Sequence, residues 1–369
     1  MSPRDVKKYL SVTCHPVRSA MSLAPDAPAS GLEFELLNRF QRDFPLLPRP
    51  FAWIGEQLGI DEATVIDKLQ AMQARGWISR VGAVFRPNAV GASALAALSV
   101  PPARLDEVAD LVSGYPEINH NYEREHRFNL WFVATADSAV RLQAVLQEIE
   151  AIGGCGPMLV LPMLEGYHID LGFDLTTDST RRPGDAVEKM PAPASCGIQP
   201  ATLISEQERA LVGALQDGLA FVDRPFAALG CAETEAIATL AHWLDVGVVK
   251  RFGVIVRHHE VGFTSNAMVV WDVPDAEVSD IGQHIARSGL VTLCYRRPRQ
   301  PPHWPYNLFC MMHGRDRAEV EARIVALAES CALGAHPRAT LFSSRRFKQR
   351  GACYTASPEI SPEATDGRD

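Results

Sequence analysis

The chain has 369 residues, 47% of them hydrophobic, which is enough to build more than one folded core. Its net charge of −8 argues against a general nucleic-acid-binding protein, because phosphate contacts require an excess of Lys and Arg. The eight cysteines are scattered, which predicts reduced thiols. The sequence has no evident signal peptide and no apolar run of about 18 residues, so we expect a cytoplasmic protein that does not span a membrane.

The first elements along the chain are helical. Residues 1–30 are rich in Pro, Ser and Ala, and we expect them to be poorly ordered. Apolar residues then recur at three- and four-residue spacings, a turn is expected at Gly59, and a strand follows Gly76. Three short helices and a strand predict a winged helix-turn-helix over 31–80. The apolar positions are Leu36, Leu37, Phe40, Ile54, Leu58, Val65, Ile66, Leu69 and Met72.

Residues 81–175 alternate between strand and helix patterns. Strands are expected near 80–86, 93–100, 117–123, 128–134 and 158–164, with helices over about 103–113 and 138–151. This order of elements, with short hairpins, predicts a ferredoxin-like α/β sandwich.

After a proline-rich stretch at 176–200, which we interpret as a linker, the chain repeats itself. The segments 49–52, 75–84 and 119–124 recur as 224–227, 246–255 and 292–297. We therefore expect a second winged helix-turn-helix over 201–250 and a second sandwich over 251–355, followed by a loose tail over 356–369. Expected strands are 249–257, 266–273, 291–297 and 307–313, with helices over 275–288 and 316–330. The predicted fold class is α+β, a tandem duplication of both domain types.

The expected recognition helices are unusually acidic. The stretch 61–75 carries three carboxylates against Lys68 and Arg75, and its counterpart 232–246 has no Lys or Arg. The second unit is also shorter, by about one helical turn, between its Arg-Pro-Phe-Ala and Leu-Gly pairs. Because groove binding needs cations, we expect no stable DNA binding.

A winged helix followed by this sandwich resembles the leucine-responsive regulator (Lrp/AsnC) architecture over nearly all of 31–355. Within it, residues 120–132 resemble the first-subunit signature of the siroheme decarboxylases, and residues 294–299 with 303–314 resemble the second-subunit signature. The resemblance implies both subunits fused in one chain. It also implies removal of carbon dioxide from two acetate side chains of siroheme, giving didecarboxysiroheme on the way to heme d1 or heme.

The resemblance implies several further properties. The α/β domains of Lrp-type proteins pair face to face, so the two halves are expected to form an intramolecular pseudo-dimer with a macrocycle site in each copy. Further homo-oligomers and other enzymes of heme d1 biosynthesis are possible partners. No cofactor is expected beyond the iron of the substrate, because the conjugated ring can accept the electron pair that decarboxylation leaves.

Arginines are the strongest chemical signal, because the guanidinium fork matches the eight carboxylates of siroheme. We favour substrate contact over plain surface charge for Arg296, Arg297 and Arg299. A second basic cluster at 345–350 is left open between these two interpretations. With the family motifs, the expected substrate-binding residues are Arg124, Arg127, Arg296, Arg297, Arg299, His303, Trp304, Asn129 and Asn307. The proline-rich insert 298–305, which contains two of them, is expected to be a semi-rigid loop and a plausible lid.

Strand alternation puts His120, Tyr122 and Arg124 on one face, whereas the second copy has Leu293, Tyr295 and Arg297. A lone histidine on a strand usually has no catalytic role. Because His120 shares its face with Tyr122 and Arg124, we favour an active-site role for it. We expect His120, His126, Tyr122 and Tyr295 to be the catalytic residues, with the two histidines in proton transfer.

The residues that would bind the substrate iron are not fixed by the sequence. His258 and His259 are candidate axial ligands, His120 and His126 are others, and His313 is expected to end a strand. Two functions from other classes stay open at this stage. They are a DNA-binding transcriptional regulator and a tetrapyrrole-binding sensor or carrier without turnover.

Overall fold

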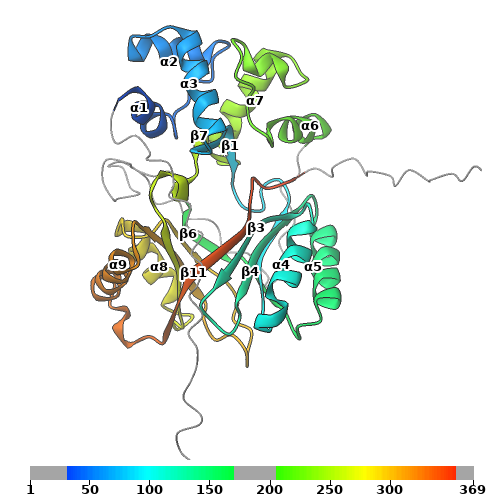
Figure 1. Ribbon diagram of the computed structural model, residues 1–369, viewed down its shortest axis with the longest axis vertical. Coiled ribbons are helices and arrows are strands. Elements are labelled where there is room, and N and C mark those ends of the chain that lie inside the picture. The colour runs from blue at the N-terminus through cyan, green and yellow to red at the C-terminus, as the bar shows by residue number, and fades with distance from the viewer. Residues whose placement is uncertain (1–30, 170–204, 355–369) are drawn as a thin grey trace, which may run out of the picture.

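The computed structural model describes residues 31–169 and 205–354, which form two layers (Figure 1). The upper layer contains the helix-turn-helix units of both halves, and the lower layer contains both α/β units. The expected N-terminal segment 1–30, the linker 176–200 and the tail 356–369 lie outside the described residues. No helix in the described ranges is long and apolar enough to cross a membrane.

The upper layer repeats one helical unit with a difference in length. The first half has α1 (Leu32–Arg39), α2 (Pro50–Leu58) and α3 (Glu62–Ala74), and the second has α6 (Glu206–Leu215), η2 (Pro225–Ala228) and α7 (Glu233–Asp245). The nine-residue α2 thus becomes a four-residue 3₁₀ turn, which confirms the predicted shortening. Local sequence sets the ends: Gly59 closes α2 with a φ of 71°, and Asp61 caps α3 by accepting from the Thr64 amide.

The strand that follows each helical unit does not join the sandwich, contrary to our expectation for 80–86 and 249–257. Instead β1 (Ile78–Phe85) and β7 (Val249–Val256) pair with each other as an antiparallel two-stranded ribbon, with Gly82 opposite Gly253. Their apolar side chains pack into the core of the helical layer. The boundaries drawn at 80/81 and 250/251 therefore fall inside continuous strands.

The lower layer contains two units whose elements follow the same order, except that the first ends in two strands and the second in one long strand; three 3₁₀ turns link them. The first unit is β2 (Ala92–Leu98), α4 (Leu105–Gly114), β3 (Ile118–Arg124), β4 (Leu130–Ala136), α5 (Ala139–Gly153), β5 (Leu159–Pro162) and β6 (Glu165–Ile169). The second is β8 (Ser265–Trp271), α8 (Val278–Arg287), β9 (Leu293–Arg296), β10 (Leu308–Gly314), α9 (Arg317–Ser330) and β11 (Arg338–Gln349). The turns are η1 (Pro102–Arg104), η3 (His258–Val261) and η4 (Leu333–Ala335). The predicted α+β fold class is confirmed.

The two units share one nine-stranded sheet of order β5-β2-β4-β3-β11-β8-β10-β9-β6. The last strand of each unit extends into the other: β11 pairs first with β8 and then with β3, and β6 continues beyond β5 to pair with β9. We call β3·β11 seam one and β6·β9 seam two. The pseudo-dimer is thus built within the chain, and the sequence prediction had missed both crossing strands.

Each unit buries its sheet under its own two helices, α4 and α5 or α8 and α9 (Figure 1). We call the other side of the sheet, which these helices do not cover, the interior face. It buries a separate hydrophobic cluster made of residues from both halves. It includes Leu95 and Trp131 from the first half with Val270, Trp304 and Phe309 from the second. The interior face is therefore where residues of the two halves meet.

Candidate active site

His120 lies on β3 at seam one, opposite Gln349 of β11 and Val133 of β4. Its ring centroid is 6.3 Å from that of Tyr122, and its Nδ1 is buried without a hydrogen-bond partner. The ring as a whole keeps some exposed surface. Burial lowers the pKa of His120 to about 4, so the unliganded protein holds a neutral imidazole at pH 7.

Tyr122 and Arg124 continue the same face of β3. The Arg124 guanidinium lies 5.7 Å from the centre of the Tyr122 ring, and its Nη1 donates to the Leu341 carbonyl at 3.1 Å. Asn121 points the other way and donates to the Ala109 carbonyl of α4, which confirms the predicted shared face. Burial lowers the pKa of Arg124 to about 10, yet the guanidinium stays charged. Within the described residues no carboxylate pairs with Arg124.

Arg346 reaches seam one from the second half, directly opposite Tyr122 in the register. Its Nη2 pairs with Glu260 at 2.8 Å and its Nη1 donates to Gln349 at 3.0 Å. Its charge acts to lower the pKa of Tyr122, although burial prevails and raises it. The sequence did not decide whether Arg346 contacts substrate or is plain surface charge. In the structure it adds a cation beside the His120–Tyr122 pair.

The other cations of the 345–350 cluster serve the opposite face or the strand end. Arg345 pairs with Asp106 of α4, and Lys348 donates to the carbonyls of Ser113 and Tyr115 at the end of that helix, at 2.6 and 2.8 Å. Burial lowers the pKa of Lys348. The cluster is therefore divided, with Arg346 beside Tyr122 and its neighbours holding α4 to the sheet.

Seam two repeats part of this arrangement. Arg297 is buried, lies 4.5 Å from the centre of the Tyr295 ring and donates to the Leu161 carbonyl of the first half. Leu293 occupies the place of His120, and Gly166 faces Tyr295 where Arg346 faces Tyr122. Seam two thus has a tyrosine and a buried arginine, as seam one does, but no counterpart of His120 or Arg346 at the matching places.

The predicted group His126, Arg127, His303 and Trp304 lies around one loop. The Trp304 side chain is fully buried, 5.1 Å from the Trp131 ring, and the half-buried His126 ring packs on it at 5.5 Å. His126 Nδ1 accepts from the Phe128 amide at 3.1 Å, and Arg127 donates to the His303 carbonyl. Burial, aided by Arg127, lowers the pKa of His126. These contacts fix the 298–305 loop to the first half, so that the loop predicted to be a lid is anchored by a buried indole.

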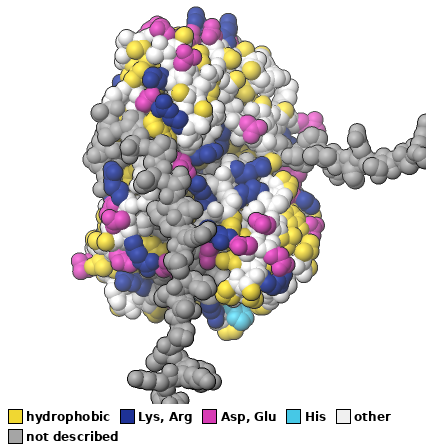
Figure 2. Space-filling model, in the orientation of Figure 1, with side chains coloured by type: hydrophobic (Ala, Val, Ile, Leu, Met, Phe, Trp, Pro, Cys, Tyr) yellow, Lys and Arg dark blue, Asp and Glu magenta, His cyan; other side chains and the backbone are white. Residues whose placement is uncertain are grey.

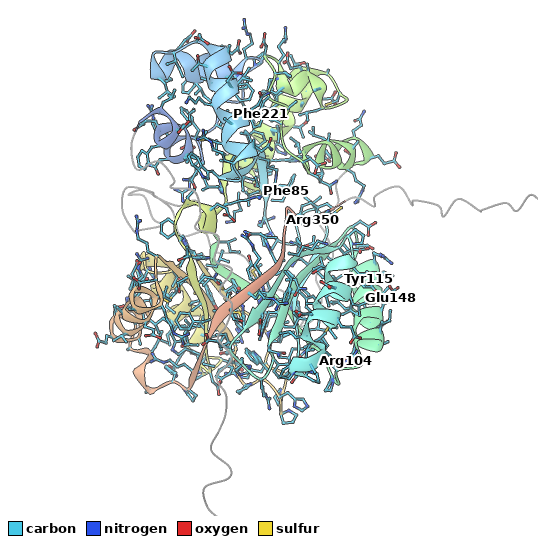
Figure 3. The ribbon with its side chains drawn as sticks, in the orientation of Figure 1. Phe85, Arg104, Tyr115, Glu148, Phe221 and Arg350 are labelled. Carbon is cyan, nitrogen blue, oxygen red and sulfur yellow. The ribbon has the colours of Figure 1, made fainter. Side chains whose placement is uncertain are left out.

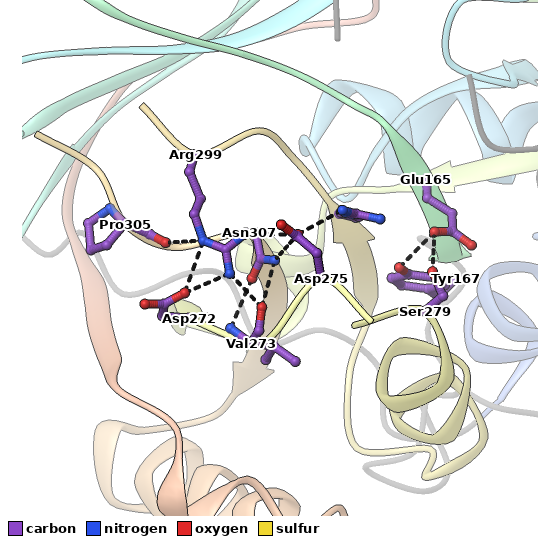
Figure 4. Close-up of polar contacts among 10 residues, drawn as sticks. Glu165, Tyr167, Asp272, Val273, Asp275, Ser279, Arg299, Pro305 and Asn307 are labelled. Atoms are coloured by element: carbon purple, nitrogen blue, oxygen red, sulfur yellow. Dashed lines mark hydrogen bonds and ion pairs between the residues drawn. The ribbon is translucent and has the colours of Figure 1, made fainter. Parts of the chain in front are cut away.

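Four other predicted substrate contacts already have partners within the protein, and Figure 4 shows those of Arg299 and Asn307. Arg296 pairs with Asp275 at 2.8 Å, and Arg299 pairs with Asp272 and Asp275 at 2.7 and 2.8 Å. Asn307 uses both ends of its amide on the Val273 backbone, at 3.0 and 2.9 Å. Asn129 does the same with Val100 at 2.8 and 2.9 Å. These contacts give Arg296, Arg299, Asn129 and Asn307 a structural use in holding strand ends, and their contact with substrate stays a prediction.

Seam two also has a buried carboxylate on its helix-facing side. Glu165 is only 4% exposed and accepts from the hydroxyls of Tyr167 and Ser279 at 3.0 and 2.7 Å (Figure 4). This places a buried carboxyl group, with two hydrogen bonds to its Oε2, at the seam that lacks the histidine.

The remaining histidines give no defined metal site. His258 and His259 fall in η3, and their side chains lie outside what the structure describes. His313 is buried with its Nδ1 2.9 Å from the Thr292 hydroxyl. Among the described residues no three His, Cys, Asp or Glu side chains cluster as a metal site would require.

The cations of the first recognition helix are paired within the protein. Lys68 of α3 lies 3.0 Å from Glu33, Arg75 lies 3.8 Å from the same carboxylate, and Arg49 pairs with Glu62. In the second half Arg224 pairs with Glu233 of α7 in the same way. These four cations therefore already have carboxylate partners.

Comparison with known protein families agrees with this arrangement. Residues 89–168 and 260–348 match the model of an AsnC-like ligand binding domain. Residues 33–78 match the model of a siroheme decarboxylase NirDL-like HTH domain.

Individual relatives match either most of the chain or one half of it. The siroheme decarboxylase NirDL subunit of Paracoccus denitrificans is 44% identical over 330 residues, covering 87% of this chain and 96% of that protein. The NirD subunit of Pseudomonas aeruginosa siroheme decarboxylase is 50% identical over 144 residues, 39% of this chain and 95% of the subunit. A crystal structure of NirDL in co-complex with an iron-uroporphyrin III analogue gives a TM-score of 0.62 at 27% identity, covering 88% of this chain and 95% of that one.

Proposed function

The chain belongs to the siroheme decarboxylase family, and on that premise we propose that it is a carboxy-lyase of heme d1 biosynthesis. It removes carbon dioxide from two acetate side chains of siroheme and gives didecarboxysiroheme. Membership of this family favours the enzyme over the DNA-binding regulator and the sensor without turnover.

The observation that carries the placement of the active site is the convergence at seam one. His120, Tyr122 and Arg124 come from the first half, and Arg346 comes from the second. A buried guanidinium without a carboxylate is costly, and Arg124 holds only a carbonyl and a thioether among the described residues. A substrate carboxylate would supply the missing counter-charge.

In the proposed reaction the bond between the acetate CH₂ carbon and its carboxylate carbon breaks, and the carboxylate leaves as carbon dioxide. The electron pair stays on the CH₂ carbon and spreads into the conjugated ring, and one proton then converts that carbon to a methyl group. Arg124 and Arg346 orient neighbouring carboxylates, while the apolar interior face keeps water from the leaving carboxylate.

His120 is the proposed proton donor, with Tyr122 orienting its ring. Its low pKa in the free protein suits this role only if the substrate changes it. Binding of a polycarboxylate beside the ring favours the imidazolium, because a nearby negative charge raises the pKa of a histidine. Proton donation would therefore be switched on by the substrate itself.

No organic cofactor is needed in this scheme, because the macrocycle accepts the electrons and brings its own iron. His258 and His259 remain the proposed axial ligands, since they adjoin Glu260, whose carboxylate holds Arg346 at seam one. We also propose that the protein works in the cytoplasm and that it exchanges substrate or product with neighbouring enzymes of the pathway. A further homo-oligomer is compatible with this scheme.

The test is anaerobic incubation of the folded protein with siroheme, followed by mass spectrometry. The expected product has lost two carbon dioxide units without added pyridoxal phosphate, thiamine or metal. Binding of siroheme without mass loss would instead indicate a sensor or carrier and would overturn the proposal.

A further inference from the structure

Arg80, on the wing strand β1, is a guanidinium that its surroundings leave unneutralised. Its Nε is buried without a partner, and its one hydrogen bond within the described ranges is a long one of 3.4 Å to the Ala83 carbonyl. Its charge lies near Asp217 and the Tyr354 hydroxyl, but in the described residues it forms an ion pair with neither. Burial lowers its pKa, which reflects the cost of holding this charge away from water. Part of the side chain is still exposed.

The pseudo-symmetric residue of the second half, Arg251 on β7, has a different environment. It is 6% exposed, and its Nη1 donates to the carbonyls of Gln41 and Val254 at 2.7 and 3.3 Å. Arg251 therefore holds the backbone of the first helical unit and of its own strand. Arg80 has no comparable set of acceptors, although duplication gave both strands an arginine at this position.

The path of the chain brings Arg80 close to seam one. Gln349 of β11 faces His120, and the next amide, of Arg350, donates to the Asn119 carbonyl at 2.8 Å. The following residue, Gly351, lies against the Arg80 guanidinium, so that a Cβ there would be 2.7 Å from Nη1. Tyr354 then packs on Phe85 of β1 at 5.4 Å. Figure 3 shows Phe85 and Arg350 together at the waist between the layers.

The waist is also where cations gather. On the face that Figure 2 displays, Lys and Arg side chains cluster between the upper and lower layers. Because a macrocycle with eight carboxylates is wider than the His120–Tyr122 pair, the carboxylates that do not react need cations beyond the reaction centre.

We propose that Arg80 forms a carboxylate-binding subsite contributed by the helix-turn-helix layer, which holds a non-reacting side chain of the substrate bound at seam one. This rests on the proposed function, and it gives the wing of a domain from which we expect no DNA binding a role in substrate recognition. Gly351 is part of the subsite, because a side chain at that position would displace the guanidinium.

The test compares Arg80→Met with Arg251→Met, using titration with the iron-uroporphyrin III analogue, turnover of siroheme, and thermal unfolding. Arg80→Met should weaken binding by about ten- to hundredfold, the equivalent of one charge-assisted hydrogen bond. Its Tm should stay the same or rise, because removal of an unneutralised buried charge relieves a cost. Arg251→Met should lower the Tm and leave binding unchanged at a temperature where it is folded.

Gly351→Ala provides a second variant that keeps the charge and both domains. It should weaken binding in the same direction as Arg80→Met, because the methyl group moves a flexible side-chain end rather than backbone. Unchanged binding in both Arg80→Met and Gly351→Ala, with wild-type turnover of siroheme, would overturn the subsite and leave the proposed function intact. If the wild-type protein neither binds the analogue nor converts siroheme, the proposed function itself fails.

Discussion

The two seams of the sheet follow the same backbone plan and carry different side chains. In both, the last strand of one half pairs with β3 or β9 of the other, and a buried arginine lies against a tyrosine ring. Seam one adds His120 and Arg346, whereas seam two has Leu293 and Gly166 at these places and a buried Glu165 nearby. The two seams thus share the scaffold, while the histidine and the second arginine are present at seam one only.

The shared arginines explain why part of the site survives in both seams. Arg124 donates to Leu341 of the other half, and Arg297 donates to Leu161 of the other half. Each bond ties one half to the other, so the pair is useful to the fold whether or not a seam is catalytic. The residues that differ between the seams therefore point to chemistry more sharply than the residues that are shared.

The largest effect is expected from His120. Replacement by Leu, the residue present at the same place in seam two, should slow decarboxylation about 10²- to 10⁴-fold, the usual contribution of a general acid. Leu293→Ala is the matched control in seam two and should keep the turnover rate. The measurement is anaerobic turnover of siroheme, in which a slow variant should accumulate the mono-decarboxylated intermediate. A wild-type rate for His120→Leu would move the reaction centre away from seam one.

His126, predicted from sequence to share this work, should matter less. Its Nδ1 accepts from a backbone amide and its ring supports Trp304, so His126→Ala should act on the anchored loop rather than on proton transfer. We expect a lower Tm and a modest loss of turnover. A loss as severe as that of His120→Leu, without a lower Tm, would restore His126 as a catalytic residue.

The next effect concerns the arginines on β11. Arg346→Ala should weaken siroheme binding by about 1.5–3 kcal/mol, because it removes a charge-assisted contact beside Tyr122. Arg345→Ala is the matched control on the neighbouring residue, where the exposed pair with Asp106 should contribute little to stability or binding. The affinity of each variant for siroheme is measured by titration under anaerobic conditions. Equal affinities would show that Arg346 contributes no more to siroheme binding than Arg345 on the other face of β11.

The difference between Arg345 and Arg346 could not have been predicted from the sequence. Alternation puts the neighbours Arg345 and Arg346 on opposite faces, but the register shifts on either side of them, between Ser343 and Arg345 and between Arg346 and Lys348, hide which face each one takes. The strand itself was missed for a related reason. Its charged residues are typical of a solvated surface, and its pairing partner lies in the other half of the chain.

Other parts of the molecule were predictable because their signals are local. The repeat, the glycines at 59 and 76 and the apolar spacing identified the helices, both sandwiches and the shortened η2. The pairing of β1 with β7 was not predictable, because a local period gives a strand but not its partner. Family motifs identified Asn129, Asn307, Arg296 and Arg299 as special, and the structure shows that their hydrogen bonds hold strand ends. A motif marks such residues without separating structural use from catalysis.

A smaller effect on stability follows from the same contrast at His120. The folded protein holds its pKa at about 4, below the ordinary value, so the unfolded chain takes up the proton first as pH falls. Stability is therefore complete near pH 7 and is lost as pH falls from about 6.5 towards 4. Between pH 7 and pH 5 the free energy of unfolding of the wild type should fall about 1–2 kcal/mol more than that of His120→Leu. Denaturant titration at both pH values measures this, and parallel losses would show that the ring is solvated.

The smallest effect is expected for DNA binding by the helix-turn-helix units, because we expect neither unit to bind DNA. The first unit keeps a full α2 and two cations in or beside α3, and the second has a single turn and no Lys or Arg over 232–246. Lys68 and Arg75 both lie beside Glu33, so contact with a phosphate would have to break those pairs. Since non-specific affinity comes from released counterions, neither unit should bind duplex DNA at physiological salt. Glu33→Gln frees Lys68 and Arg75 and should raise binding at low salt only slightly, because the matching stretch 232–246 of the second unit still offers no Lys or Arg. A sharp mobility shift by the wild-type protein at nanomolar concentration, surviving competitor DNA, would mean that these units have kept a regulatory function beside the enzyme.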